Sequence, residues 1–127
     1  MREILFRGKC IHSNEWVYGF LFITRKGQCN IKWYDPEFGS SKTSEVYPES
    51  VGQYVDYIDT NGKRVFEYDV CVDQNGRVGK IRFCSYGYAF VFVDYEPKVG
   101  VMPSEITVIG NEFDNKELER KWWIGRL

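Results

Sequence analysis

Short hydrophobic runs alternate with turn residues along most of this chain, and one long polar stretch separates two groups of them. Before that stretch, extended segments are predicted near residues 3–10, 16–24 and 29–34, which favours an antiparallel β-meander over residues 1–45. The polar stretch, residues 35–45, is rich in Pro, Gly and Ser. We interpret it as a loop that separates two subregions.

A second group of extended segments follows the polar stretch. The alternating segment Phe66–Val72 is joined to the segment Arg77–Phe83 by Asn75-Gly76, which is a hairpin turn signal. Four or five short antiparallel strands are predicted between residue 66 and the C-terminal region. Their length and density favour a small SH3-like β-barrel within residues 46–113.

One short helix is predicted near the C-terminus. Asp114 supplies a capping side chain and Glu117, three residues later, completes a capping box, which predicts about two turns through Arg120. The fold class is therefore mainly β, with one domain over residues 1–120. The short helix and a tryptophan-rich tail occupy residues 114–127.

Composition agrees with a folded, β-rich chain. Of the 127 residues, 43% are hydrophobic and 17% are aromatic, which excludes the composition of a disordered protein. The formal net charge is −1. The whole molecule therefore has no general attraction to nucleic acid or to an anionic membrane, and nucleic-acid binding would need a local basic patch.

The chain carries no sign of a membrane or secretory segment. Its longest apolar run, Trp16–Ile23, is far shorter than the ~20 residues of a membrane span. Charged residues interrupt the first apolar stretch, which is unlike a signal peptide. The four cysteines are scattered as expected for reduced thiols. We therefore expect a cytoplasmic protein with no membrane partner.

Catalytic and metal-binding chemistry is not indicated. His12 is the only histidine, and no two of the four cysteines have the close spacing that a structural zinc site takes from one turn. The sequence contains no Gly-rich phosphate loop and no Ser-centred elbow. We therefore predict no catalytic residue, no metal and no cofactor, and we expect that the protein is not an enzyme.

Basic side chains gather around two neighbouring predicted strands of the second half. A solvent-facing basic surface of this kind tracks a phosphate backbone. Acidic residues on the adjoining strand would cancel much of that charge, so an ordinary mixed-charge sheet face stays an alternative. The candidate nucleic-acid-binding residues are Lys63, Arg64, Arg77, Lys80 and Arg82.

Two adjacent tryptophans with basic neighbours, Trp122 and Trp123, stand near the end of the chain. Indole rings combine a large apolar area with one hydrogen-bond donor, which suits an anchor at a protein interface. Packing of this tail onto the protein's own core is the alternative. Both tryptophans are therefore candidate protein-interface residues.

Three blocks of sequence carry a resemblance to a known family. They are Met1–Lys9 with Glu15–Leu21, then Val46–Tyr54 with Asp59–Val70, and finally Ile106–Leu118. In this order the blocks resemble the YopX family of phage and prophage proteins. The resemblance implies a mostly β fold with an SH3-like part and an origin in a mobile element, and it implies no established activity, cofactor or catalytic residue.

One departure from the family pattern concerns the backbone. Tyr68 stands where the family has a glycine, and we interpret this as a position that does not need a positive φ angle. Taken together, the sequence predicts an accessory protein of a phage or prophage that acts as a non-catalytic binding module. Another protein or a second copy of the chain is the expected partner. A nucleic-acid-binding regulator that uses the basic face of the second half is the alternative.

Overall fold

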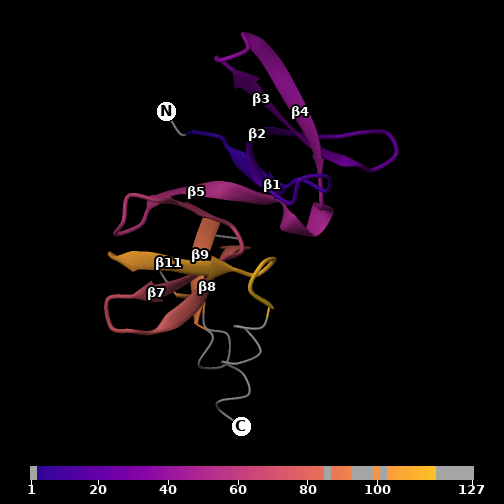
Figure 1. Cartoon of the computed structure of the whole chain (residues 1–127). Coiled ribbons are helices and arrows are strands. Elements are labelled where there is room, and N and C mark those ends of the chain that lie inside the picture. Colours follow the sequence, from indigo (N-terminus) through magenta and orange to yellow (C-terminus); the bar gives the residue numbers. More distant parts are fainter. Residues whose placement is uncertain (1–2, 85–86, 93–98, 101–102, 117–127) are drawn as a thin grey trace. The chain divides into compact units, whose positions relative to one another are not determined.

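Antiparallel β-strands make up most of the structure, a computed structural model that describes residues 3–84, 87–92, 99–100 and 103–116 (Figure 1). The mainly β fold predicted from the sequence is confirmed. The described elements are β1 (Phe6–Lys9), β2 (Trp16–Ile23), β3 (Cys29–Asp35), β4 (Ser40–Val46), the 3-10 helix η1 (Pro48–Ser50), β5 (Gly52–Ile58), β6 (Arg64–Phe66), β7 (Asp69–Asp73), β8 (Val78–Cys84), β9 (Gly87–Phe92), β10 (Val99–Gly100) and β11 (Ile106–Asn111).

The chain divides into two compact units, which we call unit 1 (residues 1–54) and unit 2 (residues 55–127). Strand β5 begins in unit 1 and ends in unit 2. A β-strand therefore leads the chain from one unit to the next. The sequence predicts instead a loop near Ser40 at this boundary.

The polar stretch 35–45 is not a loop, because it completes a long hairpin between β3 and β4 (Figure 1). Every residue of β4 pairs with β3, from Ser40 opposite Asp35 to Val46 opposite Cys29. The first four residues of β4 are exposed. Such a strand needs no apolar side chains, so the hydrophobic pattern gives no strand signal for it.

In unit 1, strands β1 to β4 follow one another as antiparallel neighbours, and β1 also pairs with the start of β5. The end of β4 returns to the end of β1, where Cys10 and Val46 form a bridge and the Ile11 N–H donates to the Glu45 carbonyl at 3.1 Å. The predicted meander is therefore present. Its core contains Cys29, Ile31 and Val46, with Phe6, Val17, Leu21, Trp33 and Val51 packed against them.

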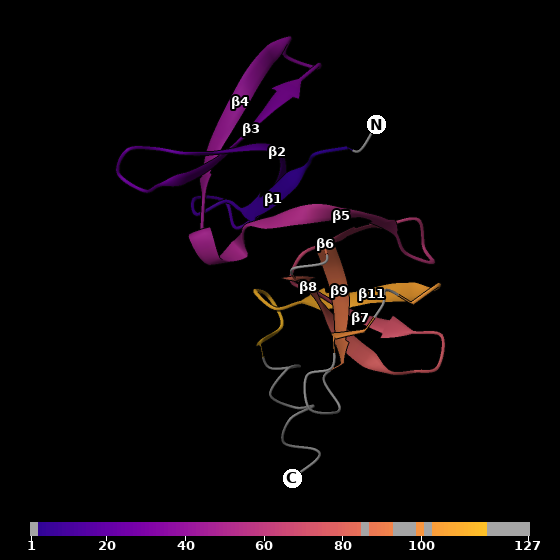
Figure 2. The same cartoon turned by 180° about the vertical axis from the view of Figure 1, so that it is seen from behind.

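In unit 2, a five-stranded antiparallel sheet has the order β10-β9-β8-β7-β11 (Figure 2). The predicted hairpin at Asn75-Gly76 joins β7 to β8, with Val72 opposite Val78. Among the described residues, the edge strands β10 and β11 do not pair with each other, and β6 pairs with β5 instead of joining this sheet. The sheet is therefore open, and the closed SH3-like barrel predicted for residues 46–113 is not observed.

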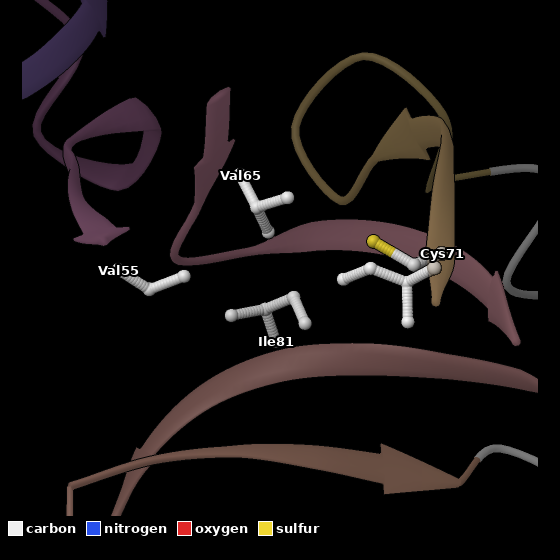
Figure 3. Packing of buried hydrophobic residues seen from close by; sticks show 5 residues of the cluster. Val55, Val65, Cys71 and Ile81 are labelled. Atoms are coloured by element: carbon white, nitrogen blue, oxygen red, sulfur yellow. The ribbon is translucent and has the colours of Figure 1, made fainter. Parts of the chain in front are cut away.

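Five buried residues from five strands form the core of unit 2 (Figure 3). They are Val55 of β5, Val65 of β6, Cys71 of β7, Ile81 of β8 and Ile106 of β11. Four of the five residues of β7 are buried. This strand is therefore covered on both faces, although its sequence alternates as a half-buried strand does.

Tyr68, which directly precedes β7, has a φ angle of +73°. Our interpretation that this position does not need a positive φ is therefore wrong. The Tyr68 N–H donates to the Ile81 carbonyl at 3.0 Å, and the Tyr68 carbonyl accepts the Glu112 N–H at 2.9 Å. Because these two bonds connect backbone atoms, they hold the left-handed conformation whatever side chain stands at the position.

We expect the variant Tyr68→Gly to be more stable than Tyr68→Ala by about 1 kcal/mol. Both variants lose the tyrosine ring, and only glycine relieves the steric strain of a Cβ atom at positive φ. In regular secondary structure alanine is the more stable of the two, so the expected order is reversed here. Urea denaturation of both variants measures the difference, and alanine equal to or better than glycine would contradict the observed backbone conformation.

The short helix predicted from Asp114 through Arg120 falls mostly on residues 117–120, outside the described residues. In the last described turn, Asn111 accepts the Asp114 N–H with its side-chain oxygen at 2.8 Å and the Asn115 N–H with its carbonyl at 2.9 Å. Over the described ranges, no helix is long and apolar enough to cross a membrane.

Candidate binding surface

Three of the exposed aromatic side chains of unit 1 lie on one face of its sheet. Phe20 and Phe22 of β2 are 69% and 42% exposed, and Tyr34 of β3 is 64% exposed. Strands β2 and β3 are antiparallel neighbours (Figure 2), and Phe20 pairs with Lys32. Tyr34 follows Lys32 by two residues, so it lies on the same face as the two phenylalanines. We call Phe20, Phe22 and Tyr34 the aromatic face.

Short or polar side chains border the aromatic face on the neighbouring strands. Cross-strand partners have Cβ atoms ~5 Å apart, so they lie beside the rings. Lys32 is exposed, and the small residues of β4 leave the rings uncovered on that side. The bordering residues are Asn30 and Lys32 of β3 and Ser41, Thr43 and Glu45 of β4.

Gly19 determines how β2 meets its neighbours. The first half of β2 pairs with β1, and from Phe20 onward it pairs with β3. A Cβ atom at Gly19 would lie 2.2 Å from the carbonyl oxygen of Lys32. Only glycine allows the two backbones to approach this closely, and this contact stands at the start of the ladder that carries the aromatic face.

A basic turn follows β2. The Thr24 N–H donates to the Gln28 carbonyl and the Gly27 N–H donates to the Thr24 carbonyl, both at 2.9 Å. Arg25 and Lys26, between these residues, are exposed. The turn therefore places two positive charges just beyond the strand that carries Phe20 and Phe22.

Sequence reasoning missed the aromatic face. Residues 16–23 are hydrophobic at almost every position, so the pattern does not tell the buried side of β2 from the exposed side. Over residues 17–22 the available signal is the type of side chain, because aliphatic Val17 and Leu21 pack on the core while Phe20 and Phe22 are exposed. Aromatic residues at every second position were the clue to a surface on this strand.

Two of the predicted nucleic-acid-binding residues, Lys80 and Arg82, meet at the carboxylate of Glu112. Both terminal nitrogens of Arg82 donate to Glu112, and Lys80 Nζ lies 3.6 Å from Glu112 Oε1. Burial lowers the pKa of Lys80, and the neighbouring Arg82 lowers it further against the opposing effect of Glu112. The Arg82 guanidinium also lies 5.1 Å from the centre of the Tyr68 ring. We call Lys80, Arg82 and Glu112 the Glu112 cluster; its net charge is only +1.

The other three predicted nucleic-acid-binding residues lie at hairpin turns. Arg77 Nε donates to Asp73 Oδ2 at 3.0 Å. Lys63 and Arg64 are exposed at the turn between β5 and β6. Three of the five predicted residues therefore engage carboxylates, which reduces the positive potential of this surface. The nucleic-acid role assigned to these residues stays a prediction.

Asp59 and Asp73 organise two hairpin turns of the same design. In each, Oδ1 accepts the backbone N–H groups two and four residues later, at 2.8–2.9 Å. Asp59 Oδ2 also accepts the Val108 N–H of β11 at 3.0 Å. Burial raises the pKa of both carboxyl groups, but the hydrogen bonds outweigh it and leave each pKa below the ordinary value of 3.8. These carboxylates therefore serve the fold of unit 2.

Trp122 and Trp123, the predicted protein-interface residues, lie outside the described residues, so their role stays a prediction. For chemistry, the part of the chain that the structure describes holds no group of three or more His, Cys, Asp or Glu side chains able to bind a metal ion.

Comparison with known proteins gives one positive result. Residues 5–118 match the model of a family described as YopX protein. No curated protein matches the chain. The matched range includes the aromatic face, the two turn aspartates and the Glu112 cluster.

Proposed function

We propose that this chain, which belongs to the YopX family, is a non-catalytic binding module whose docking surface is the aromatic face of unit 1. The observation that carries the proposal is the exposure of Phe20, Phe22 and Tyr34 on one face of a regularly paired sheet. Single exposed apolar residues are normal on protein surfaces. Several that adjoin on one face are typical of an interaction site.

The energetics of the rings support docking. Moving one phenylalanine side chain from water into a contact is worth about 1.5–3 kcal/mol. Phe20 is exposed, so the fold does not gain this free energy, and β4, on the far side of β3, carries the small side chains of Ser41 and Thr43 on the same face. A partner that buries the rings would gain this free energy on binding.

The carboxylates of unit 2 support binding over catalysis. Asp59 and Asp73 accept backbone N–H groups, and Glu112 is shared by two basic side chains. Charged groups that are already engaged in this way are poor general bases, because proton transfer would break the bonds that hold the fold. Non-catalytic binding therefore fits these residues better.

The proposal also includes a binding partner and a cellular setting. The sequence favoured another protein or a second copy of the chain as the partner, and a cytoplasmic accessory protein of phage or prophage origin as the setting. Self-association is the simplest of these expectations to measure, because it requires only the chain itself.

Sedimentation velocity of the full chain over a series of concentrations tests the docking surface. We expect self-association of the wild type, its loss in the double variant Phe20→Ser/Tyr34→Ser, and its retention in the control Phe83→Ser. Phe83 of unit 2 is 64% exposed, so the control removes a ring of similar exposure from another surface. The proposal would be contradicted by a double variant that matches the wild type both in self-association and in the oligonucleotide binding tested in the next subsection.

A further inference from the structure

The spacing of the aromatic face suits bases that are splayed apart. Phe20 and Phe22 are two residues apart on β2, which corresponds to ~6.8 Å along a strand. Successive nucleotides in a stacked strand rise by only ~3.4 Å, so neighbouring bases reach separate rings only after they unstack from each other. Tyr34 on β3 offers a third ring on the same face.

Basic side chains lie beside the aromatic face and in the turn that follows β2. Lys32 lies directly opposite Phe20, and the basic turn adds Arg25 and Lys26. Acidic residues on β3 and β4 are Asp35, which pairs with Lys42 at 3.0 Å, and Glu45, while Glu37 lies in the turn between them. Unit 1 as a whole has seven basic and six acidic residues, whereas unit 2 has ten basic and twelve acidic residues. The net charge of unit 1 is therefore +1, opposite in sign to that of the whole chain.

The mixture of side chains favours nucleic acid over protein as the occupant. Lysine is depleted in the centre of protein interfaces, yet Lys32 lies between Phe20 and Tyr34 on this face. Asn30, Ser41 and Thr43 add hydrogen-bonding groups beside the rings. Aromatic rings with interspersed basic and polar side chains on a sheet form the usual platform for single-stranded nucleic acid.

We propose that the aromatic face binds single-stranded nucleic acid, with bases stacked on Phe20, Phe22 and Tyr34 and phosphates held by Lys32 and the basic turn. This inference rests on the proposed function, because it uses the same docking surface, and it takes single-stranded nucleic acid in place of another protein or a second copy of the chain as the occupant. A duplex keeps its bases stacked inside the helix and cannot present their faces to the rings. The site is therefore selective for single strands.

Fluorescence anisotropy with the full chain tests the inference. The probes are labelled oligo-dT, oligo-dA and oligo-U of about 12 nucleotides and a duplex of equal length. We expect all three single strands to bind and the duplex to bind more weakly. Three phosphate contacts predict about 20-fold weaker binding when salt rises from about 50 mM to about 200 mM, because each contact to a single strand adds ~0.7 to the logarithmic slope.

Matched variants locate the site. Phe20→Ala and Tyr34→Ala are each expected to weaken binding about 5- to 150-fold, the effect of one lost stacking contact. Lys32→Glu is expected to weaken binding and to reduce the salt slope. Phe83→Ala and the double variant Lys63→Glu/Arg64→Glu in unit 2 are the controls and are expected to bind as the wild type does. Circular dichroism and thermal melting of every variant exclude loss of fold as the cause.

The alternative outcomes separate this inference from the proposed function. Binding that is lost in Lys63→Glu/Arg64→Glu and kept in the ring variants would overturn the inference and favour the basic residues of unit 2. Equal affinity for duplex and single strand would also overturn it. Absent oligonucleotide binding, with self-association that depends on Phe20 and Tyr34, would overturn the inference and leave the docking surface in place. If neither binding nor self-association depended on these rings, both would be rejected.

Discussion

Asp59→Asn is expected to lower the free energy of unfolding by about 2–3 kcal/mol, the usual worth of a hydrogen bond to a charged group whose loss leaves its partner unsatisfied. Asp59 Oδ2 accepts the Val108 N–H and so ties the β5–β6 turn to β11. The asparagine amide keeps one acceptor for the turn and presents a donor to Val108 in place of the second acceptor. Urea denaturation followed by circular dichroism measures the change.

Asp73→Asn is the matched control. Asp73 makes the same two turn bonds, but its Oδ2 accepts the side chain of Arg77, which is 49% exposed and can turn to water. We expect a loss of about 1 kcal/mol for this variant, since exposed ion pairs contribute little. Equal losses in the two variants would show that the contact from Asp59 to β11 contributes nothing beyond the turn itself.

The same aspartate predicts a dependence on pH. Burial raises the pKa of Asp59, and hydrogen bonds from Val108, Lys63 and Asn61 lower it to a net value below 3.8. The unfolded chain therefore binds more protons than the folded one near this pH, so the stability that Asp59 provides is present above pH 3.8 and is lost as the pH falls through the folded pKa. Asp59→Asn does not titrate, and its stability should fall less than that of the wild type on acidification.

Glu112→Gln is expected to destabilise the protein by about 2–3 kcal/mol, less than the 3–5 kcal/mol of a fully buried pair because Arg82 is partly exposed. The change leaves Lys80 and Arg82 beside each other without the carboxylate that both contact. Thermal and urea denaturation measure the loss. Arg77→Gln, which removes an exposed ion pair, is the control and should cost under about 1 kcal/mol.

The Glu112 variant also predicts a change at alkaline pH. Burial already lowers the pKa of Lys80 from 10.5, and loss of Glu112 removes the contact that raises it. The folded variant then releases this proton before the unfolded chain does, so its stability should recover as the pH rises toward 10.5. If Glu112→Gln were no less stable than Arg77→Gln, and if its stability did not rise toward pH 10.5, a structural role for the Glu112 cluster would be contradicted.

The parts of the fold that the sequence predicted are those with a local signal. Aromatic and β-branched runs bounded by turns predicted the strands before residue 35, and Asn75-Gly76 predicted the β7–β8 hairpin. The three family blocks were sufficient to identify the family, which the match over residues 5–118 confirms. These features depend on residues that are close together in the sequence and on the residue types that form turns. A single sequence is therefore enough to predict them.

The parts that the sequence did not predict depend on distant contacts. Strand β4 is polar because its first residues face water, so only its pairing with β3 makes it a strand. The conformation of Tyr68 follows from backbone bonds to Ile81 and Glu112, which lie far away in the sequence. Closure of a barrel likewise depends on which edges pair, and strand spacing along the chain does not determine that.

The candidate site was likewise predicted only where the signal was local in the sequence. The basic residues of unit 2 were visible as a cluster of charges, but their carboxylate partners came from distant positions such as Glu112. Phe20 and Phe22 were hidden inside a run that is hydrophobic at almost every position, and only the register between β2 and β3 shows that Tyr34 shares their face. Exposure of a side chain is a property of the folded sheet and has no counterpart in the hydrophobic pattern.

The central claim is that the aromatic face of unit 1 is the docking surface, and an NMR titration tests it most directly. Oligo-dT is added to the ¹⁵N-labelled full chain, and amide chemical shifts are followed residue by residue. We predict that the largest changes fall on Phe20, Phe22, Lys32 and Tyr34. Changes centred on Lys63, Arg64 and the Glu112 cluster would contradict the claim.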